Sequence, residues 1–213
     1  KFIQKVVKNF PVNATGFDLK EVHELPVPII KLEKDWQNDY IFVLGFEYQG
    51  QTRFLANDPK PNRVKLQITD NDYCFVKVIR NIPAEKIIID QILSIGLINK
   101  SGSAYIPAIE VPDEKNGELD KRIISLEWII EHYEDLLNQG IKIEQSLESL
   151  IRFERPSLQL AMVSQPDWFD IKAVIRIGDF SIPFLALKRH ILNNIREYKL
   201  PDDSVFIIPT EWF

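Results

Sequence analysis

Residues 40–55 read YIFVLGFEYQGQTRFL, and this stretch decides the fold class of the chain. Side chains of a β-strand alternate between its two faces, so residues two apart in sequence share a face. The Gln49-Gly50 pair predicts a turn, after which residues 52–55 return as the second strand of a hairpin. One face of the first strand is apolar or aromatic throughout, with Tyr40, Phe42, Leu44, Phe46 and Tyr48.

The segment that follows predicts a second hairpin and then a helix. Residues 63–68 and 73–78 have strand character and flank a turn-forming Asp-Asn-Asp sequence at 70–72. Asn81 then predicts a helix N-cap, and Gly96 is well placed to cap the C-terminal end of the same helix. The apolar stripe of this helix is Ile88, Ile92 and Ile95.

The second half of the chain is predicted to contain two further helices and four strands. One helix is predicted from Ser125 to Gly140, with a buried face made of Leu126, Ile129, Ile130, Tyr133 and Leu137. Strands are predicted over residues 158–163, 169–177, 198–200 and 205–208. Pro183 opens a third helix, whose inward side chains are Phe184, Leu187, Ile191 and Ile195. Runs of strands separated by helices indicate an α+β fold with mostly antiparallel sheets and about three helices.

Composition places the chain among globular proteins. The 213 residues are 45% hydrophobic and 27% charged, which allows a sizeable core and excludes a disordered chain. The single cysteine, Cys74, excludes an internal disulfide and suits a reducing compartment. No apolar run reaches the length of a membrane span and no signal peptide is visible. We therefore expect a cytoplasmic protein without membrane association.

Short motifs for catalysis or metal binding are incomplete in this sequence. Gly45 and Gly50 have the spacing of a phosphate-binding loop, but Gln51 stands where that loop needs a lysine for the phosphates. The three histidines lack the spacing of zinc ligands, and no serine has the Gly-x-Ser-x-Gly context of a nucleophile. A carboxylate pair for glycoside chemistry stays open, although no particular pair indicates it. The sequence therefore predicts no catalytic residue, no cofactor site and no metal site in this chain.

The charge distribution argues against a strong nucleic-acid binder but leaves a local site open. The net charge is −5, with 14 Lys and Arg against 13 Asp and Glu up to residue 110 and 12 against 18 after it. Phosphate neutralisation drives most DNA affinity, so a dedicated DNA-binding module usually carries a basic excess. Basic residues nevertheless cluster near the C-terminus, and three of them are candidate nucleic-acid contacts. They are Lys188, Arg189 and Arg196.

The last third of the chain carries an ordered set of motifs. An Asp-Trp-Phe-Asp-Ile sequence starts at Asp167, and a strand, a Gly-Asp turn and a helix follow it. Leu-Pro-Asp-Asp-Ser at residues 200–204, an apolar run and Pro-Thr-Glu-Trp at residues 209–212 complete the order. This order resembles the segment just upstream of the motor in bacterial Swi/Snf-family helicase-like ATPases. The resemblance is best over residues 157–213; Arg80-Asn81 with Glu85 adds a weaker match to the same family.

Eight residues match the family signature and are expected to be structural or to face the motor. They are Asp167, Trp168, Phe169, Asp170, Leu200, Pro201, Asp202 and Trp212. One position departs from the pattern, because Asp203 stands where the family has a glycine. Aspartate tolerates turn conformations better than most residues, so we expect the turn to form.

The resemblance implies that the parent protein is an ATP-driven translocase on double-stranded nucleic acid. ATP and magnesium would then belong to a motor that these residues do not contain. We expect residues 1–155 to form a β-rich accessory domain with two helices and residues 156–213 a small α+β module. The chain starts at Lys1 without methionine and stops at Trp212-Phe213, so we expect a segment of a longer protein.

Two functions follow as expectations. The first is a non-catalytic accessory or regulatory region that packs on, or positions, its own downstream motor. The alternative is a nucleic-acid-binding module that presents duplex DNA to the motor, through Lys188, Arg189 and Arg196. An independent enzyme ranks last, because no set of residues supports one.

Overall fold

The computed structural model of the chain describes residues 5, 6, 8, 18–69, 72–108, 121–164 and 169–213. These residues belong to two compact units. The first unit is made of Lys1–Leu32, Ile41–Ile109 and Gln139–Glu144, and the second of Glu33–Tyr40, Glu110–Asn138 and Gln145–Phe213. Residue 155 lies inside the second unit, and the domain boundary predicted there stays a prediction. No helix within the described residues is long and apolar enough to cross a membrane.

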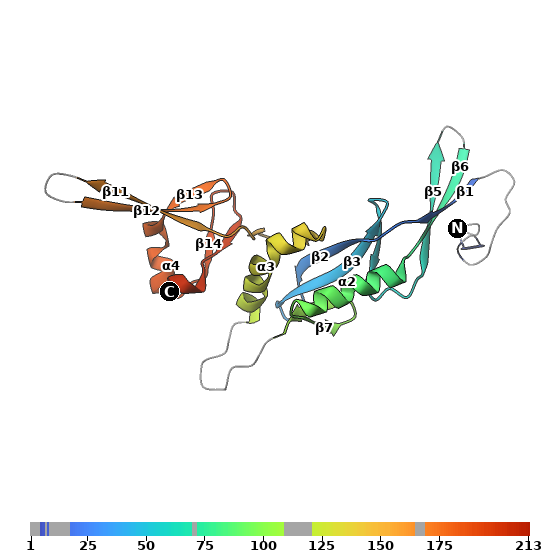
Figure 1. Cartoon of the computed structure of the whole chain (residues 1–213), viewed down its shortest axis with the longest axis horizontal. Helices are drawn as coiled ribbons and strands as arrows, with labels where there is room; N and C mark the ends of the chain where they lie inside the picture. Colours follow the sequence, from blue (N-terminus) through green and yellow to red (C-terminus); the bar gives the residue numbers. More distant parts are fainter. Residues whose placement is uncertain (1–4, 7, 9–17, 70–71, 109–120, 165–168) are drawn as a thin grey trace. The chain divides into compact units, whose positions relative to one another are not determined.

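The first unit is built mainly of strands (Figure 1). Its strands are β1 (Asp18–His23), β2 (Val27–Lys34), β3 (Tyr40–Tyr48), β4 (Thr52–Leu55), β5 (Asn62–Thr69), β6 (Asp72–Ile79), β7 (Leu97–Ser101), β8 (Ala104–Pro107) and β9 (Lys142–Gln145). Six of them form one sheet in the order β7-β8-β3-β2-β9, with β4 paired to β3. The other three form a sheet in the order β1-β6-β5, in which β1 and β6 are parallel. Both hairpins predicted from the sequence, β3–β4 and β5–β6, are confirmed as antiparallel pairs.

Helix α2 (Ile82–Ser94) joins β6 to β7 and confirms the predicted caps. The Asn81 side chain accepts a hydrogen bond from the Ala84 backbone N–H at 3.2 Å, which satisfies one of the free donors of the first turn. At the other end Gly96 takes a φ of 91°, a conformation that glycine adopts without a steric penalty. Ile92 of the predicted stripe is buried, whereas Ile88 and Ile95 are half-buried.

A buried ion pair fixes the start of α2. The Arg80 guanidinium donates to the Glu85 carboxylate, with Nε–Oε1 at 2.9 Å and Nη2–Oε2 at 2.5 Å, and both side chains are almost fully buried. The Tyr48 hydroxyl, from the end of β3, donates to Glu85 Oε1 at 2.6 Å and accepts from the Asn81 N–H at 2.9 Å. Arg80 also donates to the carbonyl oxygen of Asp58 in the loop after β4. The cluster therefore ties a helix, a strand and a loop together.

A second buried acidic residue, Glu47 of β3, is also paired. Glu47 accepts from Lys142 Nζ of β9 at 2.5 Å and from Arg53 Nε of β4 at 2.9 Å. The hydrogen bond from Lys142, followed by that from Arg53, lowers the pKa of Glu47 although burial opposes the shift. Arg53 continues to Glu144 through two further bonds, at 2.9 and 2.8 Å. These ion pairs cross-link three strands of the six-stranded sheet.

The second unit contains the remaining elements. They are α3 (Lys121–Asn138), β10 (Ile151–Arg152), β11 (Ser157–Ser164), β12 (Phe169–Ile177), β13 (Phe180–Pro183), the 3₁₀ turn η1 (Phe184–Leu187), α4 (Lys188–Leu192), β14 (Glu197–Lys199), β15 (Val205–Ile207) and the 3₁₀ turn η2 (Thr210–Trp212). Two three-stranded sheets have the orders β10-β15-β14 and β11-β12-β13. Their shared core consists of Ile175, Ile177, Ile182, Leu187, Leu200, Phe206 and Ile208.

The predicted α+β class with mostly antiparallel sheets is confirmed, and the described residues contain the three expected helices. Two details predicted for α3 were wrong. Helix α3 begins at Lys121, so Ser125 lies inside it and donates its hydroxyl to the Tyr40 carbonyl at 3.3 Å instead of capping the helix. Leu136 is fully buried while Leu137 is 41% exposed, because Leu136 is the residue that continues the stripe of Leu126 and Ile129.

The third helix is shorter than predicted. The chain after Pro183 forms the 3₁₀ turn η1 and then only five residues of α4. Leu187 is fully buried as expected, but Ile195 lies beyond the end of α4 and is 46% exposed. The predicted inward stripe therefore stops one turn early.

Among the groups of this buried cluster, the Glu85 carboxylate is the one whose removal should lower the free energy of unfolding the most. Glu85→Ala leaves the buried Arg80 guanidinium without its counter-ion, and we expect the free energy of unfolding to fall by about 3–5 kcal/mol. Tyr48→Phe keeps the ion pair and loses only the hydroxyl, so it should cost about 1–2 kcal/mol. Urea titrations of the two variants and the wild type measure both values. Equal losses in the two variants would contradict the central role of the ion pair.

Candidate functional site

The signature residues at 200–204 form a tight turn between β14 and β15. Leu200 is buried in the core of the second unit, whereas Pro201 and Asp202 are exposed. The backbone closes the turn with Leu200 N–H donating to the Ser204 carbonyl at 2.8 Å and Asp203 N–H to the Leu200 carbonyl at 3.0 Å. Asp203 takes a φ of 65°, the left-handed conformation for which the family's glycine is suited. Aspartate thus keeps the turn, as the sequence predicts.

Asp202 connects this turn to β10. One of its oxygens, Oδ1, accepts from the Ser204 hydroxyl at 2.5 Å and from the Ser204 N–H at 3.1 Å. The other, Oδ2, accepts from Arg152 Nη2 at 2.5 Å, and Arg152 Nε donates to the Ser204 hydroxyl oxygen at 3.0 Å. The Ser204 hydroxyl, followed by Arg152, lowers the pKa of Asp202 from its ordinary 3.8 to about 2. The signature aspartate therefore has a structural partner.

The remaining signature residues have different positions. Trp212, in η2, is half-buried, and its ring packs against Phe184 and Phe206 with centroid distances of 5.7 and 6.3 Å. Phe169 and Asp170 lie at the start of β12, paired in register with Ser164 and Val163. Asp167 and Trp168 lie outside the described residues. Their expected role stays a prediction.

The three candidate nucleic-acid contacts do not share one environment. Lys188 and Arg189 are exposed at the start of α4, and among the described residues neither takes part in an ion pair. Arg196 is different, because its side chain is only 16% exposed and pairs with Glu127 Oε1 of α3 at 2.6 Å. Its Nε also donates to the Ile208 carbonyl at 2.8 Å. Arg196 is thus engaged in holding α3 against the end of β15.

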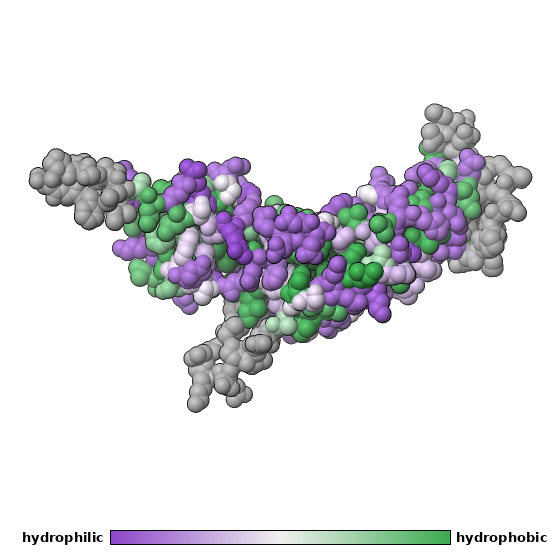
Figure 2. Space-filling view, in the orientation of Figure 1, coloured by the Kyte–Doolittle hydropathy of each residue, from purple (hydrophilic) through white to green (hydrophobic). Residues whose placement is uncertain are grey.

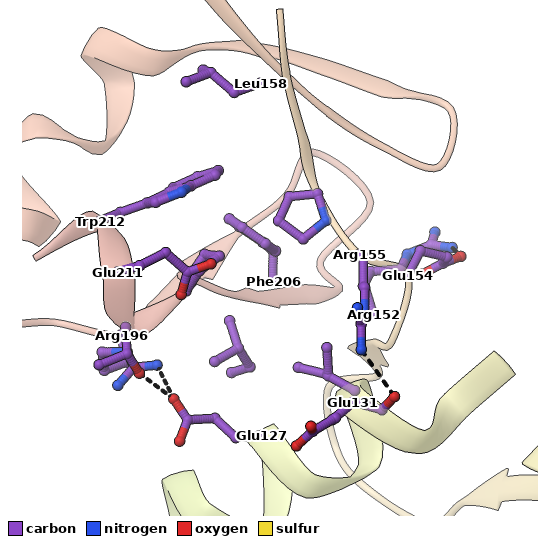
Figure 3. A pocket seen from close by; sticks show the side chains of 15 residues that line it. Glu127, Glu131, Arg152, Glu154, Arg155, Leu158, Arg196, Phe206, Glu211 and Trp212 are labelled. Carbon is purple, nitrogen blue, oxygen red and sulfur yellow. Dashed lines mark hydrogen bonds and ion pairs between the residues drawn. The ribbon is translucent and has the colours of Figure 1, made fainter. Parts of the chain in front are cut away.

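A pocket of about 530 Å³ opens next to Trp212 within the second unit (Figure 3). Its apolar wall is made of Ile130, Pro156, Leu158, Phe206, Ile207, Pro209 and Trp212. Its polar lining is Glu127, Glu131, Arg152, Glu154, Arg155, Arg196, Thr210 and Glu211. The lining therefore comes from α3, from the segment around β10 and β11, and from the C-terminal residues.

Most charges in the pocket already have partners. Arg196 pairs with Glu127, and Arg152 pairs with Asp202 and, at 3.7 Å, with Glu154. Arg155 Nη2 donates to the main-chain carbonyl of Glu131 at 3.1 Å (Figure 3). The carboxylates of Glu131 and Glu211 are exposed and form no ion pair or hydrogen bond with any described side chain. The pocket is thus lined by two carboxylates without a partner, by the Arg155 guanidinium, which no described carboxylate neutralises, and by the ring of Trp212.

Histidines contribute no cluster within the described residues. His132 stacks on Trp128 and contacts the Trp128 carbonyl through Nδ1 at 2.9 Å, one turn earlier on α3. His190 packs edge-on against Tyr198. No group of three or more His, Cys, Asp or Glu side chains that could hold a metal ion occurs in the described parts of the chain.

The sequence analysis missed the pocket, although it singled out Trp212 and Arg196. Glu127, Glu131, Arg155 and Glu211 come from positions up to 84 residues apart, counted from Glu127 to Glu211. Spacing along the chain carries no signal for such a set, because only the packing of α3 against the C-terminal segment brings it together. The weak local signal was the basic Arg-x-x-Arg-Pro sequence at residues 152–156.

Comparison of the chain with protein-family models, with curated proteins and with solved structures finds no match in any of the three. The resemblance to the region upstream of Swi/Snf-family motors therefore rests on the order of motifs in residues 157–213 and on the weaker match at Arg80, Asn81 and Glu85.

Acid should weaken the turn that Asp202 holds. Its pKa is lower in the folded protein than its ordinary 3.8, so the stabilisation is complete above that value and is lost as the pH falls towards 2. The difference in melting temperature between wild type and Asp202→Asn should therefore be largest at neutral pH and shrink below about pH 4. Thermal unfolding at a series of pH values measures it.

Ser204→Ala is the matched variant, because it removes the hydroxyl that lowers the pKa of Asp202 most. Ser204→Ala should partly reduce the pH dependence of the melting temperature and leave the ion pair between Arg152 and Asp202 in place. A difference between wild type and Asp202→Asn that is the same at pH 2.5 and at pH 7 would contradict this role of Asp202.

Proposed function

We propose that this chain is a non-catalytic accessory region of an ATP-dependent Swi/Snf-type DNA translocase, and that it packs on or positions the motor. The observation that carries the proposal is the way in which the signature residues fold. Leu200 lies in the core of the second unit, Asp202 holds a turn, and Trp212 forms a wall of an open pocket. These are the roles of residues that build a docking module, and none of them requires bound nucleotide.

The buried ionisable groups support a structural rather than a catalytic role. Glu85 accepts from Arg80 and Tyr48, and Glu47 accepts from Lys142 and Arg53. A general base needs an accessible lone pair within hydrogen-bond reach of a substrate. Carboxylates that are buried and already accept several charged donors do not offer one, so their chemistry serves the fold.

Nucleotide hydrolysis is the assay that tests the proposal on the chain itself. The purified chain should release no phosphate from ATP with magnesium, with or without duplex DNA, above the rate of a blank preparation. The Glu85→Gln variant tests whether a buried carboxylate takes part in any hydrolysis, and Glu211→Gln tests the same for an exposed carboxylate. The proposal would be contradicted by ATP hydrolysis that co-elutes with the chain from two different chromatography columns and that is abolished in either variant.

The alternative function, presentation of duplex DNA to the motor, is favoured by one specific observation. Lys188 and Arg189 are adjacent, exposed and without an ion pair among the described residues. Free basic side chains on a surface can neutralise phosphates and release their counter-ions. Arg196 adds little to such a surface, since Glu127 already neutralises it.

The salt dependence of DNA binding separates the two functions. If Lys188 and Arg189 contact phosphates, the double variant Lys188→Ala/Arg189→Ala should reduce the slope of log affinity against log salt by about 1.8. Lys20→Ala/Lys86→Ala removes the same charge from exposed positions of the first unit and should leave the slope unchanged. Fluorescence anisotropy with a labelled duplex measures both. A flat titration at low salt would count against the DNA-binding function.

A further inference from the structure

We propose that β11 and the pocket at its start form a binding site for an extended segment of a partner protein. The segment adds to the free edge of β11 as a strand and places a lysine or arginine side chain in the pocket. This inference does not depend on the translocase proposal, because it rests only on the surface of the second unit.

The edge of β11 lacks the features that normally prevent strand addition. Its only hydrogen-bonded neighbour within the described residues is β12, so its other edge carries unpaired backbone groups. The strand reads SLQLAMVS, with no charged residue and no proline over eight positions. Folded proteins usually protect a strand edge of this length with lysine, proline or a bulge. A neutral and regular edge is instead a template on which an extended peptide can pair.

On one face of β11, apolar side chains extend past the packed core and are exposed to solvent. In the β11–β12 register Leu158 lies opposite Ile175 and Leu160 opposite Ala173, so these residues share a face. Ile175 is fully buried, but Leu158 is 45% and Leu160 is 67% exposed. Apolar side chains therefore continue along this face past the packed core, and Figure 2 shows apolar surface beside the β11–β12 hairpin. An added strand would cover them with its own alternate side chains.

The pocket lies at the beginning of the same strand. Leu158 of β11 and Pro156, the residue just before that strand, both line the pocket, so a segment paired with β11 passes the pocket opening. In strand addition, main-chain hydrogen bonds supply affinity while pockets for individual side chains supply specificity. The volume of about 530 Å³ is large enough for a long side chain.

The charge of the pocket selects the side chain that enters. Two carboxylates, Glu131 and Glu211, are uncommitted, and Arg155 donates to a main-chain carbonyl. The indole of Trp212 lines the same pocket (Figure 3), and a cation over an aromatic face is attracted by its negative centre. A guanidinium or ammonium group satisfies both features, and the four Glu and three Arg side chains of the lining leave a formal charge of −1 that favours a cation over a phosphate. The occupant is therefore a basic and aliphatic protein strand.

A synthetic peptide tests the site with the chain as it exists. The probe is the end-capped heptapeptide Arg-Val-Thr-Val-Thr-Val-Arg, which brings an arginine to the pocket in either strand direction. One control peptide has glutamate at both ends, and the other has proline in place of the central valine. Fluorescence anisotropy measures affinity, and amide shifts of residues 157–161 in ¹H–¹⁵N spectra locate the binding. We expect the arginine peptide to bind at least about tenfold more tightly than either control.

Two variants separate the strand edge from the pocket. Leu160→Lys places a charge on the free edge and should weaken the binding of the arginine peptide, whereas Leu192→Lys, at another exposed leucine of the same unit, should not. Glu131→Gln/Glu211→Gln should remove most of the preference for the arginine peptide over the glutamate peptide. The control Glu134→Gln/Glu148→Gln alters two exposed carboxylates outside the pocket and should preserve that preference.

Three results would overturn the proposal. The first is no binding of the arginine peptide, and the second is binding that shifts amides elsewhere but not those of residues 157–161. The third is self-association through β11, seen as a dimer by light scattering that Leu160→Lys converts to a monomer. That result would show that a second copy of the chain occupies the edge. Because none of these measurements involves ATP or DNA, a failure here is distinguishable from a failure of the accessory function.

Discussion

The Arg80 guanidinium and the Glu85 carboxylate are buried together, and such a pair is tolerated only while every donor and acceptor in it is satisfied. Tyr48 from β3 and the loop after β4 supply the remaining partners, so these hydrogen bonds hold the start of α2, the end of β3 and that loop together. The first unit is therefore fixed by a polar constraint as much as by its apolar core.

The second unit uses its charges differently. Arg152 with Asp202, and Arg196 with Glu127, join segments that are far apart in sequence and leave the core between them apolar. Among the described residues, Leu158 of the edge strand β11 and the unpaired carboxylates of Glu131 and Glu211 line the same pocket, and the exposed Leu160 follows on that strand. A module that satisfies most of its internal charges and leaves the regular, uncharged edge of β11 open beside a pocket with two unpaired carboxylates is suited to holding a partner. This division of roles supports an accessory function over a catalytic one.

Local patterns predicted the local structure of this chain well. The alternation in residues 40–55 and the cap at Asn81 depend on near neighbours, and both are confirmed. The burial of Glu85 was not predictable, because its partner Tyr48 lies 37 residues earlier. The short α4 was also missed, since the helix ends in a local turn, with Asn194 at a φ of 55°, while the apolar pattern continues to Ile195. The candidate site could be predicted only for Trp212 and Arg196, because packing alone assembles the rest.

The central claim is that these residues accompany a motor, and the coding sequence beyond the codon for Phe213 tests it most directly. The account predicts an open reading frame that continues into a glycine-rich loop ending in Gly-Lys-Thr or Gly-Lys-Ser. An Asp-Glu pair at the end of a predicted strand should follow, as nucleotide hydrolysis by such motors requires. A stop codon close to Phe213, or a downstream domain without these motifs, would contradict the account.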